Sequence, residues 1–356
     1  MTNTHNDITR LLSHASLDEA LAWLLVRRND CSDVRAIQRD WPAFKTRMRA
    51  QIRHGHYQFS PLRVFSIEGG TVGRWSAQDA LLIKALSNLL QWRLRGRFNR
   101  VCYSVAGGGG MKAACRTLNA KLRGYRYCFK SDVANYYYSI NHHLLLCQLE
   151  KNIHDKRLIH LVGQCLNRVE VYQAEHRLVY RGICKGCSLS PLLGNLYLLM
   201  LDQTMEKRGY TMIRFMDDFI ILTKTRHQLR RAVKDVYAVL KTLELQLAKA
   251  KTYIGPIARG FDFLGYHFSY HGLGVGKKSV SRMREKVLRL YERGACATRI
   301  EGYLSHWMRW LKAGLQGRIE SALEPLLLTI HSIQQKIKFA QRNRLGVEHV
   351  ATLISA

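Results

Sequence analysis

Acidic residues are scarce in this sequence. The 356 residues include 26 Asp and Glu against 56 Lys and Arg, so the formal net charge is +30. A surplus of this size attracts anions, and nucleic acid is the commonest polyanion in a cell. A membrane-surface protein would gather its basic residues on one amphipathic helix, whereas here they are spread over the chain. The composition therefore favours a protein that binds nucleic acid.

Long apolar runs, a disulfide framework and a secretion signal are also missing. No apolar run approaches the roughly 20 residues that cross a bilayer. The nine cysteines are scattered and odd in number, unlike a disulfide framework. The opening MTNTHND contains neither the basic nor the apolar segment of a signal peptide. The sequence thus predicts a cytoplasmic protein with no membrane partner.

A second pair of closely spaced cysteines is absent as well. Cys184 and Cys187 form one CxxC, but a zinc site normally needs another pair or two histidines at suitable spacing. A redox site would require a strand-to-helix setting. The spacing alone therefore does not indicate a metal or redox site.

Only five prolines interrupt the chain, and its periodicity changes along its length. Residues 17–54 show helical spacing, with Ser16 as the predicted N-cap. Residues 60–75 alternate and turn at Gly69-Gly70, which predicts a hairpin, and Ser76 is placed to cap the next helix. The later predicted elements are a strand from 125 that runs into a turn, a helix capped by Asn141, a helix from Ser190 to Gly209, strands at 210–215 and 219–224, a helix at 226–247, a strand pair at 260–275, and helices from Ser279 broken at Gly294 and Gly314. This order predicts the α+β class.

Two adjacent aspartates, Asp217 and Asp218, lie in the apolar run MIRFMDDFIILT. Burying two carboxylates there costs several kcal/mol unless positive charge compensates. A solvated turn is one explanation, but a third acid, Asp132, also lies on an apolar strand. Three acids on adjacent strands, with Met216 at the hairpin tip, would hold two Mg²⁺ ions, with Mn²⁺ as an alternative. One ion would activate a 3′-hydroxyl and the other would stabilise leaving pyrophosphate.

Five ordered motifs resemble those of reverse transcriptases of the bacterial group II intron and retron lineage. They are SDVANYYYSINHHLL, KGCSLSPLLGNLYL, RFMDDFIIL, AKAKT and FDFLGYHF. The resemblance covers about residues 20–310 and implies a right-hand polymerase fold. It implies N-terminal helices and fingers at 1–120, an antiparallel-sheet palm with helices at 121–278, a helical thumb at 279–317, and a basic helical extension at 318–356.

The resemblance implies that Asp132, Asp217 and Asp218 are the catalytic, metal-binding acids, and Val133 is counted with them among the metal ligands. Phe215 stands where a tyrosine is commoner. Lys251 matches a lysine that protonates pyrophosphate, although a surface lysine is the alternative.

Substrate-binding positions are implied in the same way. Tyr137 matches the residue that excludes the ribose 2′-hydroxyl, with a core aromatic as the alternative. Met216 matches the position near the primer terminus, and Arg74 matches a phosphate-binding arginine. Lys185 stands where glutamine is usual, and Gly186 allows close approach of backbone to the nucleotide.

Nucleic-acid contacts are implied at Gly265 and Tyr266, in the hairpin that holds the primer. Gly107 to Gly110 replace a pattern that usually carries arginine, and Lys112 is the cation nearest to them. These glycines form a phosphate-binding nest, a close contact with the template, or a flexible tip without a ligand. Glu68 replaces the usual fingers lysine, and Trp307 and Trp310 are core or template-stacking residues.

No nuclease, integrase or protease segment is recognised, so we expect a stand-alone polymerase. With its altered fingers it is most similar to the "unknown group" reverse transcriptases of antiphage defence. This implies a companion non-coding RNA as template, a DNA primer or product, dNTPs, and a second reverse transcriptase or another copy of the chain as partners. A retron or degraded intron polymerase, template-independent or protein-directed synthesis, and a non-catalytic RNA-binding protein remain alternatives.

Overall fold

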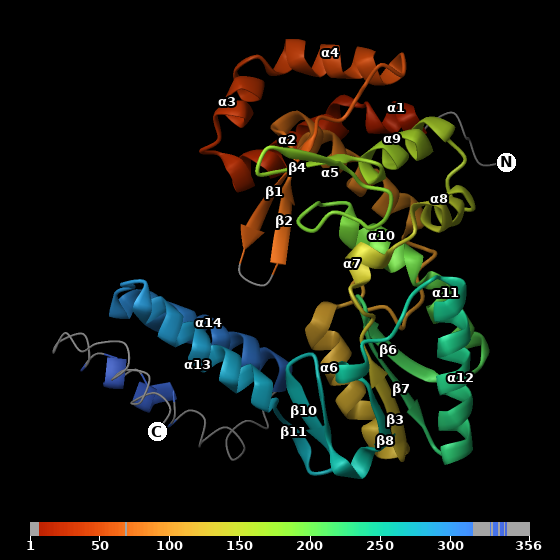
Figure 1. The fold of residues 1–356 in the computed structure, drawn as a ribbon, viewed down its shortest axis with the longest axis vertical. Coiled ribbons are helices and arrows are strands. Elements are labelled where there is room, and N and C mark those ends of the chain that lie inside the picture. Colours follow the sequence, from red (N-terminus) through yellow and green to blue (C-terminus); the bar gives the residue numbers. More distant parts are fainter. Residues whose placement is uncertain are drawn as a thin grey trace. The chain divides into compact units, whose positions relative to one another are not determined.

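Among the described residues, helices dominate at 7–53 and at 277–315, and the strands lie between these two regions (Figure 1). The structure is a computed structural model, and it describes residues 7–67, 70–315, 328, 330–333, 335–337 and 339. The helices are α1 (Asp7–Leu11), α2 (His14–Arg28), α3 (Ser32–Arg39), α4 (Trp41–Arg53), α5 (Ala77–Leu94), α6 (Gly110–Lys121), α7 (Tyr136–Ser139), α8 (His142–Glu150), α9 (Lys156–Leu166), α10 (Ser190–Tyr197), α11 (Leu199–Lys207), α12 (Arg226–Thr242), α13 (Lys277–Glu292) and α14 (Ala297–Leu315), with the short 3₁₀ turns η2 (Leu122–Gly124), η3 (Lys249–Lys251) and η4 (Ile257–Arg259).

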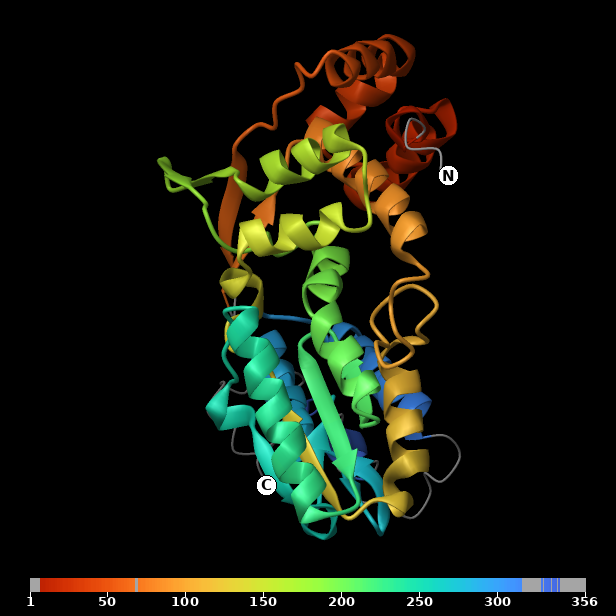
Figure 2. The ribbon, with the colours of Figure 1, turned by 90° about the vertical axis from the view of Figure 1, so that its right-hand side faces the viewer.

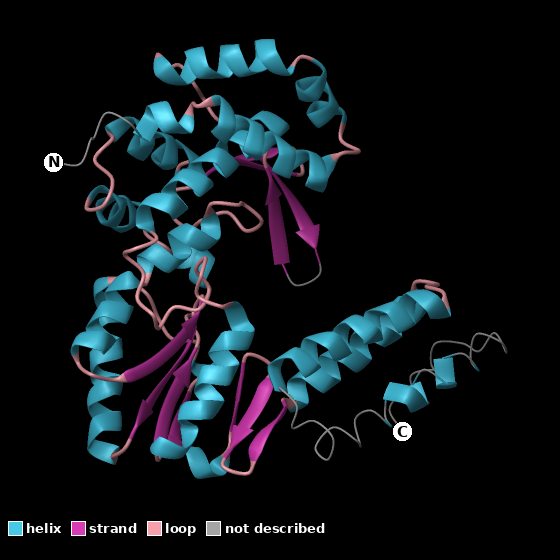
Figure 3. Cartoon of the chain, turned by 180° about the vertical axis from the view of Figure 1, so that it is seen from behind, coloured by secondary structure: helices cyan, strands magenta, loops and turns pink. Residues whose placement is uncertain are grey.

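The strands form three sheets, seen as magenta arrows in Figure 3. They are β1 (Leu62–Ile67), β2 (Gly70–Arg74), β3 (Tyr127–Ser131), β4 (Val169–Tyr172), β5 (Glu175–Leu178), β6 (Thr211–Phe215), β7 (Asp218–Thr223), β8 (Tyr253–Pro256), β9 (Phe261–Phe263), β10 (Tyr266–Ser269) and β11 (Gly272–Val275). The sheet orders are β2-β1-β4-β5, β6-β7-β3-β8 and β11-β10-β9. Pairing is antiparallel between β1 and β2, β3 and β8, β4 and β5, and along the last sheet, while β1 and β4 are parallel. The predicted α+β class is confirmed.

The chain divides into two compact units. Unit 1 comprises Met1–Gly108, Ser131–Ile221 and Arg230–Thr252, and unit 2 comprises Gly109–Lys130, Leu222–Leu229 and Tyr253–Ala356. In unit 1, α1, α2 and α3 pack against α5, which is buried along most of its length. In unit 2, α13 and α14 enclose a core with Ile330, Ile333 and Ile337.

Several local predictions are confirmed. Ser76 and Asn141 cap α5 and α8, since their side chains accept hydrogen bonds from Asp79 N–H and Leu144 N–H. The hairpin at 60–75 forms as β1 and β2, although residues 68–69 of its predicted turn lie outside the described residues. These elements form as predicted because their signals are local in the sequence.

Other local predictions are wrong in detail. The N-cap of α2 is Ser13, whose hydroxyl accepts from Ser16 N–H, so Ser16 lies inside the helix. The helix predicted from Ser190 to Gly209 is interrupted at Leu198, and Figure 2 shows the green α10 and α11 following each other. The strand pair at 260–275 contains three strands. The predicted strand from 125 ends at Ser131, and α7 follows it.

Candidate active site

The tip of the β6–β7 hairpin consists of Met216 and Asp217, because β6 ends at Phe215 and β7 begins at Asp218. Met216 has a positive φ of 58°, a conformation that is uncommon for a residue with a side chain. Its backbone N–H donates to Ser104 Oγ at 3.0 Å, and its carbonyl accepts from Arg214 Nη1 at 2.7 Å. These two bonds hold the tip in its strained conformation.

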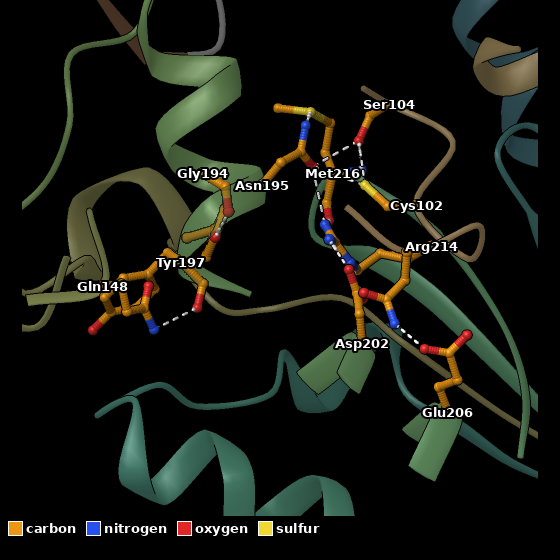
Figure 4. A network of polar contacts seen from close by, with 12 residues as sticks. Cys102, Ser104, Gln148, Gly194, Asn195, Tyr197, Asp202, Glu206, Arg214 and Met216 are labelled. Atoms are coloured by element: carbon orange, nitrogen blue, oxygen red, sulfur yellow. Dashed lines mark hydrogen bonds and ion pairs between the residues drawn. The ribbon is translucent and has the colours of Figure 1, made fainter. Parts of the chain in front are cut away.

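Arg214 anchors this tip from inside the protein (Figure 4). Its side chain and that of Asp202 are both fully buried and form a bidentate ion pair, with Nε to Oδ1 at 2.6 Å. Burial alone would lower the pKa of Arg214, but the charge and hydrogen bonds of Asp202 outweigh it and raise the pKa. Asn195 Oδ1 accepts a further bond from Arg214 Nη1 at 3.0 Å. The hairpin is thus fixed to α10 and α11.

Asp132 follows the end of β3 and is buried, with 4% of its surface exposed. Its backbone oxygen accepts from Ala248 N–H at 2.8 Å, and Val133 pairs with Leu247. Its carboxylate Oδ2 accepts a hydrogen bond from Lys251 Nζ. Within the part of the chain that the structure describes, no amide, amine or hydroxyl group donates a hydrogen bond to the buried Oδ1 of Asp132. An unpaired buried carboxylate oxygen is costly, and a cation beside it would remove that cost.

The structure brings Asp132 and Asp217 together. Burial, followed by the hydrogen bond and the charge of Asp132, raises the pKa of Asp217 from 3.8 to about 7. The charge of Asp218 also raises the pKa of Asp217. Hydrogen bonding to Asp132 raises the pKa of the Lys251 amine. Near neutral pH, Asp217 is therefore partly protonated when no cation is present.

The donor set fits a hard divalent cation because its side-chain ligands are carboxylate oxygens. Asp132 supplies an unpaired buried oxygen, Asp217 lies beside it, and Val133 can offer only backbone atoms. Across the described residues, no group of three or more His, Cys, Asp or Glu side chains is already arranged to hold a metal ion. The pair of Asp132 and Asp217 is thus formed in this structure, whereas a metal-binding arrangement of all three acids is not.

Tyr137 lies close enough to Asp217 to respond to its charge. Burial and then Asp217 raise the pKa of Tyr137 to about 12. Its ring stacks with that of Tyr136 at 5.9 Å between centroids. Gly194 makes room for both rings, since a Cβ atom there would lie 3.3 Å from each. Tyr137, the tyrosine predicted to discriminate between sugars, therefore lies near Asp217.

The loop before α10 packs against β2, and this brings three predicted substrate-binding residues into one region of unit 1. Gly73 N–H donates to the carbonyl of Lys185 at 3.1 Å. Gly186 has a φ of +88°, and a Cβ there would approach Val72 Cγ2 to 2.8 Å. Lys185 Nζ lies 4.6 Å from the ring centroid of Tyr138. Arg74, at the end of β2, contacts Cys31 Sγ at 2.7 Å.

The CxxC cysteines do not bond to each other, since every cysteine is free. A hydrogen bond with Cys165 lowers the pKa of Cys187 to about 7. Cys184 Sγ instead donates to the carbonyl of Lys185 at 3.2 Å.

Unit 2 gathers the three residues predicted to bind nucleic acid. Leu264 and Gly265, both with positive φ, form the turn between β9 and β10. Tyr266 stacks on Trp310 at 4.9 Å, and Lys112 Nζ donates to Tyr266 Oη at 2.6 Å. Lys112 also lies 4.4 Å from the Trp310 ring centroid, and burial lowers its pKa to about 8. The cluster ties α6, β10 and α14 together.

An acid pair beside the tip of an antiparallel hairpin, backed by helices, defines the palm of a right-hand polymerase fold. The pattern of the family described as "Reverse transcriptase (RNA-dependent DNA polymerase)" matches residues 76–268, more than half of the chain. The chain therefore belongs to the reverse transcriptase family, and its enzyme class is RNA-directed DNA polymerase.

Similar proteins include "Protein YkfC" of Escherichia coli (strain K12), 23% identical over 62% of this chain and 69% of its own length. "Group II intron-encoded protein LtrA" of Lactococcus lactis subsp. cremoris is 24% identical over 47% of this chain and 27% of its own length. A solved chain titled "Partial Cas6-RT-Cas1--Cas2 complex" has a TM-score of 0.42 at 21% identity, covering 68% of this chain and 43% of that chain. The chain thus spans under half of the solved chain and about a quarter of LtrA.

Sequence reasoning missed the residues that support the hairpin. Arg214 in the apolar strand TMIRF and Asp202 in the apolar helix before it were visible signals, because a buried charge requires a partner. Ser104 and Asn195 gave no such signal. Among the described helices, none is long and apolar enough to cross a membrane.

Proposed function

We propose that this chain copies RNA into DNA at Asp132, Asp217 and Asp218, with two divalent cations, Mg²⁺ or Mn²⁺, as cofactors. The observation that carries the proposal is the buried, unpaired Oδ1 of Asp132 beside Asp217, whose pKa is about 7. Such a pair is unfavourable without a cation and favourable with one. When bound, the cations would supply activation of the 3′-hydroxyl and stabilisation of the leaving pyrophosphate.

The chain's own residues position the reactants. Asp217 must lose its proton to act as a ligand, so protonation competes with cation binding near pH 7. The Lys251 amine donates to Asp132 Oδ2, and in this proposal it gives a proton to pyrophosphate. Tyr137 limits space at the sugar, and Arg74, Lys185, Gly186 and Met216 line the nucleotide's approach. Gly265, Tyr266 and Lys112 support the primer in unit 2.

The test is primer extension on an RNA template with dNTPs and Mg²⁺. Asp217→Asn combined with Asp218→Asn should lower the rate by at least a thousandfold, while the folded state remains. The matched control is Asp40→Asn, because Asp40 is an exposed acid in a long 3.5 Å ion pair with Arg47. EDTA should abolish synthesis by wild type. Unchanged synthesis in the double variant would refute the assignment.

We further propose that the template is a companion non-coding RNA and that the product serves antiphage defence. The net charge of +30 supports an RNA partner of any sequence. The departures at Lys185 and Gly107 to Gly110 support a dedicated RNA over a general template. A retron or a degraded intron polymerase is the alternative.

Sequencing of the RNA that co-purifies with the chain, and of the DNA that it makes, separates these roles. A single small RNA together with reduced phage plaque formation supports defence. A short branched RNA–DNA product supports a retron. Loss of plaque protection in Asp217→Asn with Asp218→Asn would show that defence requires synthesis.

A further inference from the structure

A cavity of about 670 Å³ lies in unit 1 among the N-terminal helices, and Asp132, Asp217 and Asp218 are not among its lining residues. Three segments line it: α1 and the start of α2, the second half of α5, and the glycine-rich loop that follows α5. Its volume falls within the roughly 300–1,000 Å³ typical of small-molecule sites. In Figure 2, α5 (orange) leads directly into this loop. The lining residues are Arg10, Ser13, Ala15, Ser16, Glu19, Asn88, Leu89, Gln91, Trp92, Arg95, Ala106 and Gly107.

A stack of arginine on tryptophan forms one wall. The Arg10 guanidinium carbon lies 3.7 Å from the centroid of the Trp92 ring, and that of Arg93 lies 5.0 Å away. Arg93 is held by Asp7, whose Oδ1 accepts from its Nε at 2.6 Å. Among the described residues, none forms an ion pair or a hydrogen bond with the Arg10 guanidinium, whereas the backbone carbonyl of Arg10 accepts from Ser13 N–H. Its N–H donors are thus oriented by the ring yet available to an anion.

The remaining lining offers groups that suit a base and a phosphate. Arg95 is a second exposed cation, and Glu19 is the one acid among the lining residues. Within the described residues, the amide nitrogen of Asn88 is buried without a hydrogen-bond partner. Gly107 has a φ of +81° and open space where a Cβ would be, so its backbone is accessible. Amide and carboxylate groups recognise base edges, whereas arginines recognise phosphate.

We propose that this cavity binds a nucleotide, with the base stacked on the Arg10–Trp92 wall and the phosphate held by Arg10 and Arg95. The nucleotide is either free or part of a single-stranded RNA. Bases stack on aromatic rings and on guanidinium planes alike, which this wall supplies together. The proposal gives a role to the glycine-rich loop and does not depend on polymerase activity.

The cavity shares a wall with a smaller one of about 210 Å³. Gln91, Arg95 and Ala106 line both, and the smaller cavity also reaches Ser104 and Asn195. Ser104 and Asn195 bond to Met216 at the hairpin tip. A ligand that restricts the motion of Ala106 and Gly107 therefore also restricts the loop near Ser104, which is two residues before Ala106.

Two probes distinguish the sources of the nucleotide: AMP, followed by calorimetry, and a fluorescein-labelled hexa-adenylate RNA, followed by anisotropy, both in EDTA and 300 mM KCl. Trp92→Leu and Arg10→Gln should each weaken binding about tenfold or more, the scale of one lost stacking contact. Binding of AMP indicates a free-nucleotide site, and binding of the RNA alone indicates a strand site. Either of these two results supports the proposal.

The matched controls are Trp23→Leu and Arg27→Gln, because Arg27 lies over the Trp23 ring at 5.2 Å and neither residue lines the cavity. These controls should change affinity less than twofold. Thermal melting checks that each variant is folded. Crosslinking of 4-thiouridine RNA should label peptides that contain residues 7–19 or 88–107. If Trp92→Leu and Arg10→Gln bind both probes as tightly as their controls do, the proposal is overturned.

Discussion

At the scale of single residues, the main tension is between the burial of Asp217 and its charge. The nearby Asp132 adds to the cost of ionising it, so the protein without a cation favours the protonated form near neutral pH. Lys251 offsets part of this cost, because its amine pairs with Asp132. The site is therefore destabilised in the absence of a cation, which favours binding of one.

Asp217→Asn should stabilise the folded protein in EDTA, and more at high pH. The folded pKa of about 7 lies above the ordinary 3.8, so wild type has its full stability below pH 4 and loses stability as the pH rises to 7. At pH 8 the free energy of unfolding of Asp217→Asn should exceed that of wild type by at most about 4 kcal/mol, and this difference should shrink toward pH 4. Urea denaturation at both pH values measures it. An equal gain at both would show that Asp217 is not the responsible group.

Tyr137→Ala should admit ribonucleotides, because the ring beside Asp217 limits the space for a 2′-hydroxyl. We expect the ratio of rNTP to dNTP incorporation to rise at least tenfold in single-nucleotide extension. Tyr138→Ala is the control, since Tyr138 is adjacent in sequence but 46% exposed and hydrogen-bonded to Thr71. If both variants keep the wild-type ratio, Tyr137 has a structural role only.

At the scale of elements, the β6–β7 hairpin depends on a buried ion pair. Asp202 holds Arg214, which in turn bonds the carbonyl of Met216. A buried pair of this kind contributes little net stability, but the loss of one partner leaves a charge uncompensated. The Asp202–Arg214 ion pair therefore mainly determines the geometry of the hairpin tip and adds little to its stability.

Asp202→Ala should destabilise the protein by about 3–5 kcal/mol, since Arg214 would remain buried without its partner. The double variant Asp202→Leu with Arg214→Met should recover most of that stability. Its polymerase rate should stay low, because the bond to Met216 is gone. Chemical denaturation and primer extension on the same preparations test both statements. A double variant that is stable and fully active would show that the pair does not position the tip.

Gly265→Ala tests the turn between β9 and β10 in unit 2. Its φ of +87° disfavours a side chain, and a Cβ would lie 2.9 Å from the Trp310 ring. A loss of about 1–3 kcal/mol is expected. Gly272→Ala is the control, because Gly272 also has a positive φ but nothing within 4 Å of the added atom. The melting temperature of Gly265→Ala should be lower than that of Gly272→Ala. The reverse order would contradict the close packing of Gly265 against Trp310.

At the scale of the whole molecule, the sequence predicts local features well, because residues close together in the chain determine them. The caps at Ser76 and Asn141 and the hairpin with Asp217 and Asp218 follow from adjacent residues. The β4–β5 hairpin, the interruption at Leu198 and the Arg10–Trp92 wall were not predicted. The Arg10–Trp92 wall joins residues more than 80 positions apart, a pairing that no local pattern encodes.

The net charge of +30 leads to a prediction for these 356 residues as a whole. RNA binding should weaken steeply with salt, because each phosphate neutralised by Lys or Arg releases a counterion. For five to seven contacts on a single strand, the slope of log K against log [KCl] should be about −3.5 to −5. Anisotropy of a labelled RNA between 50 and 400 mM KCl measures it. If the cavity is a strand site, Arg95→Gln should make the slope shallower by about 0.7, whereas Trp92→Leu should lower affinity and leave the slope unchanged, since stacking releases no counterion. A wild-type slope shallower than −1 would mean that the charge surplus is not used to hold RNA.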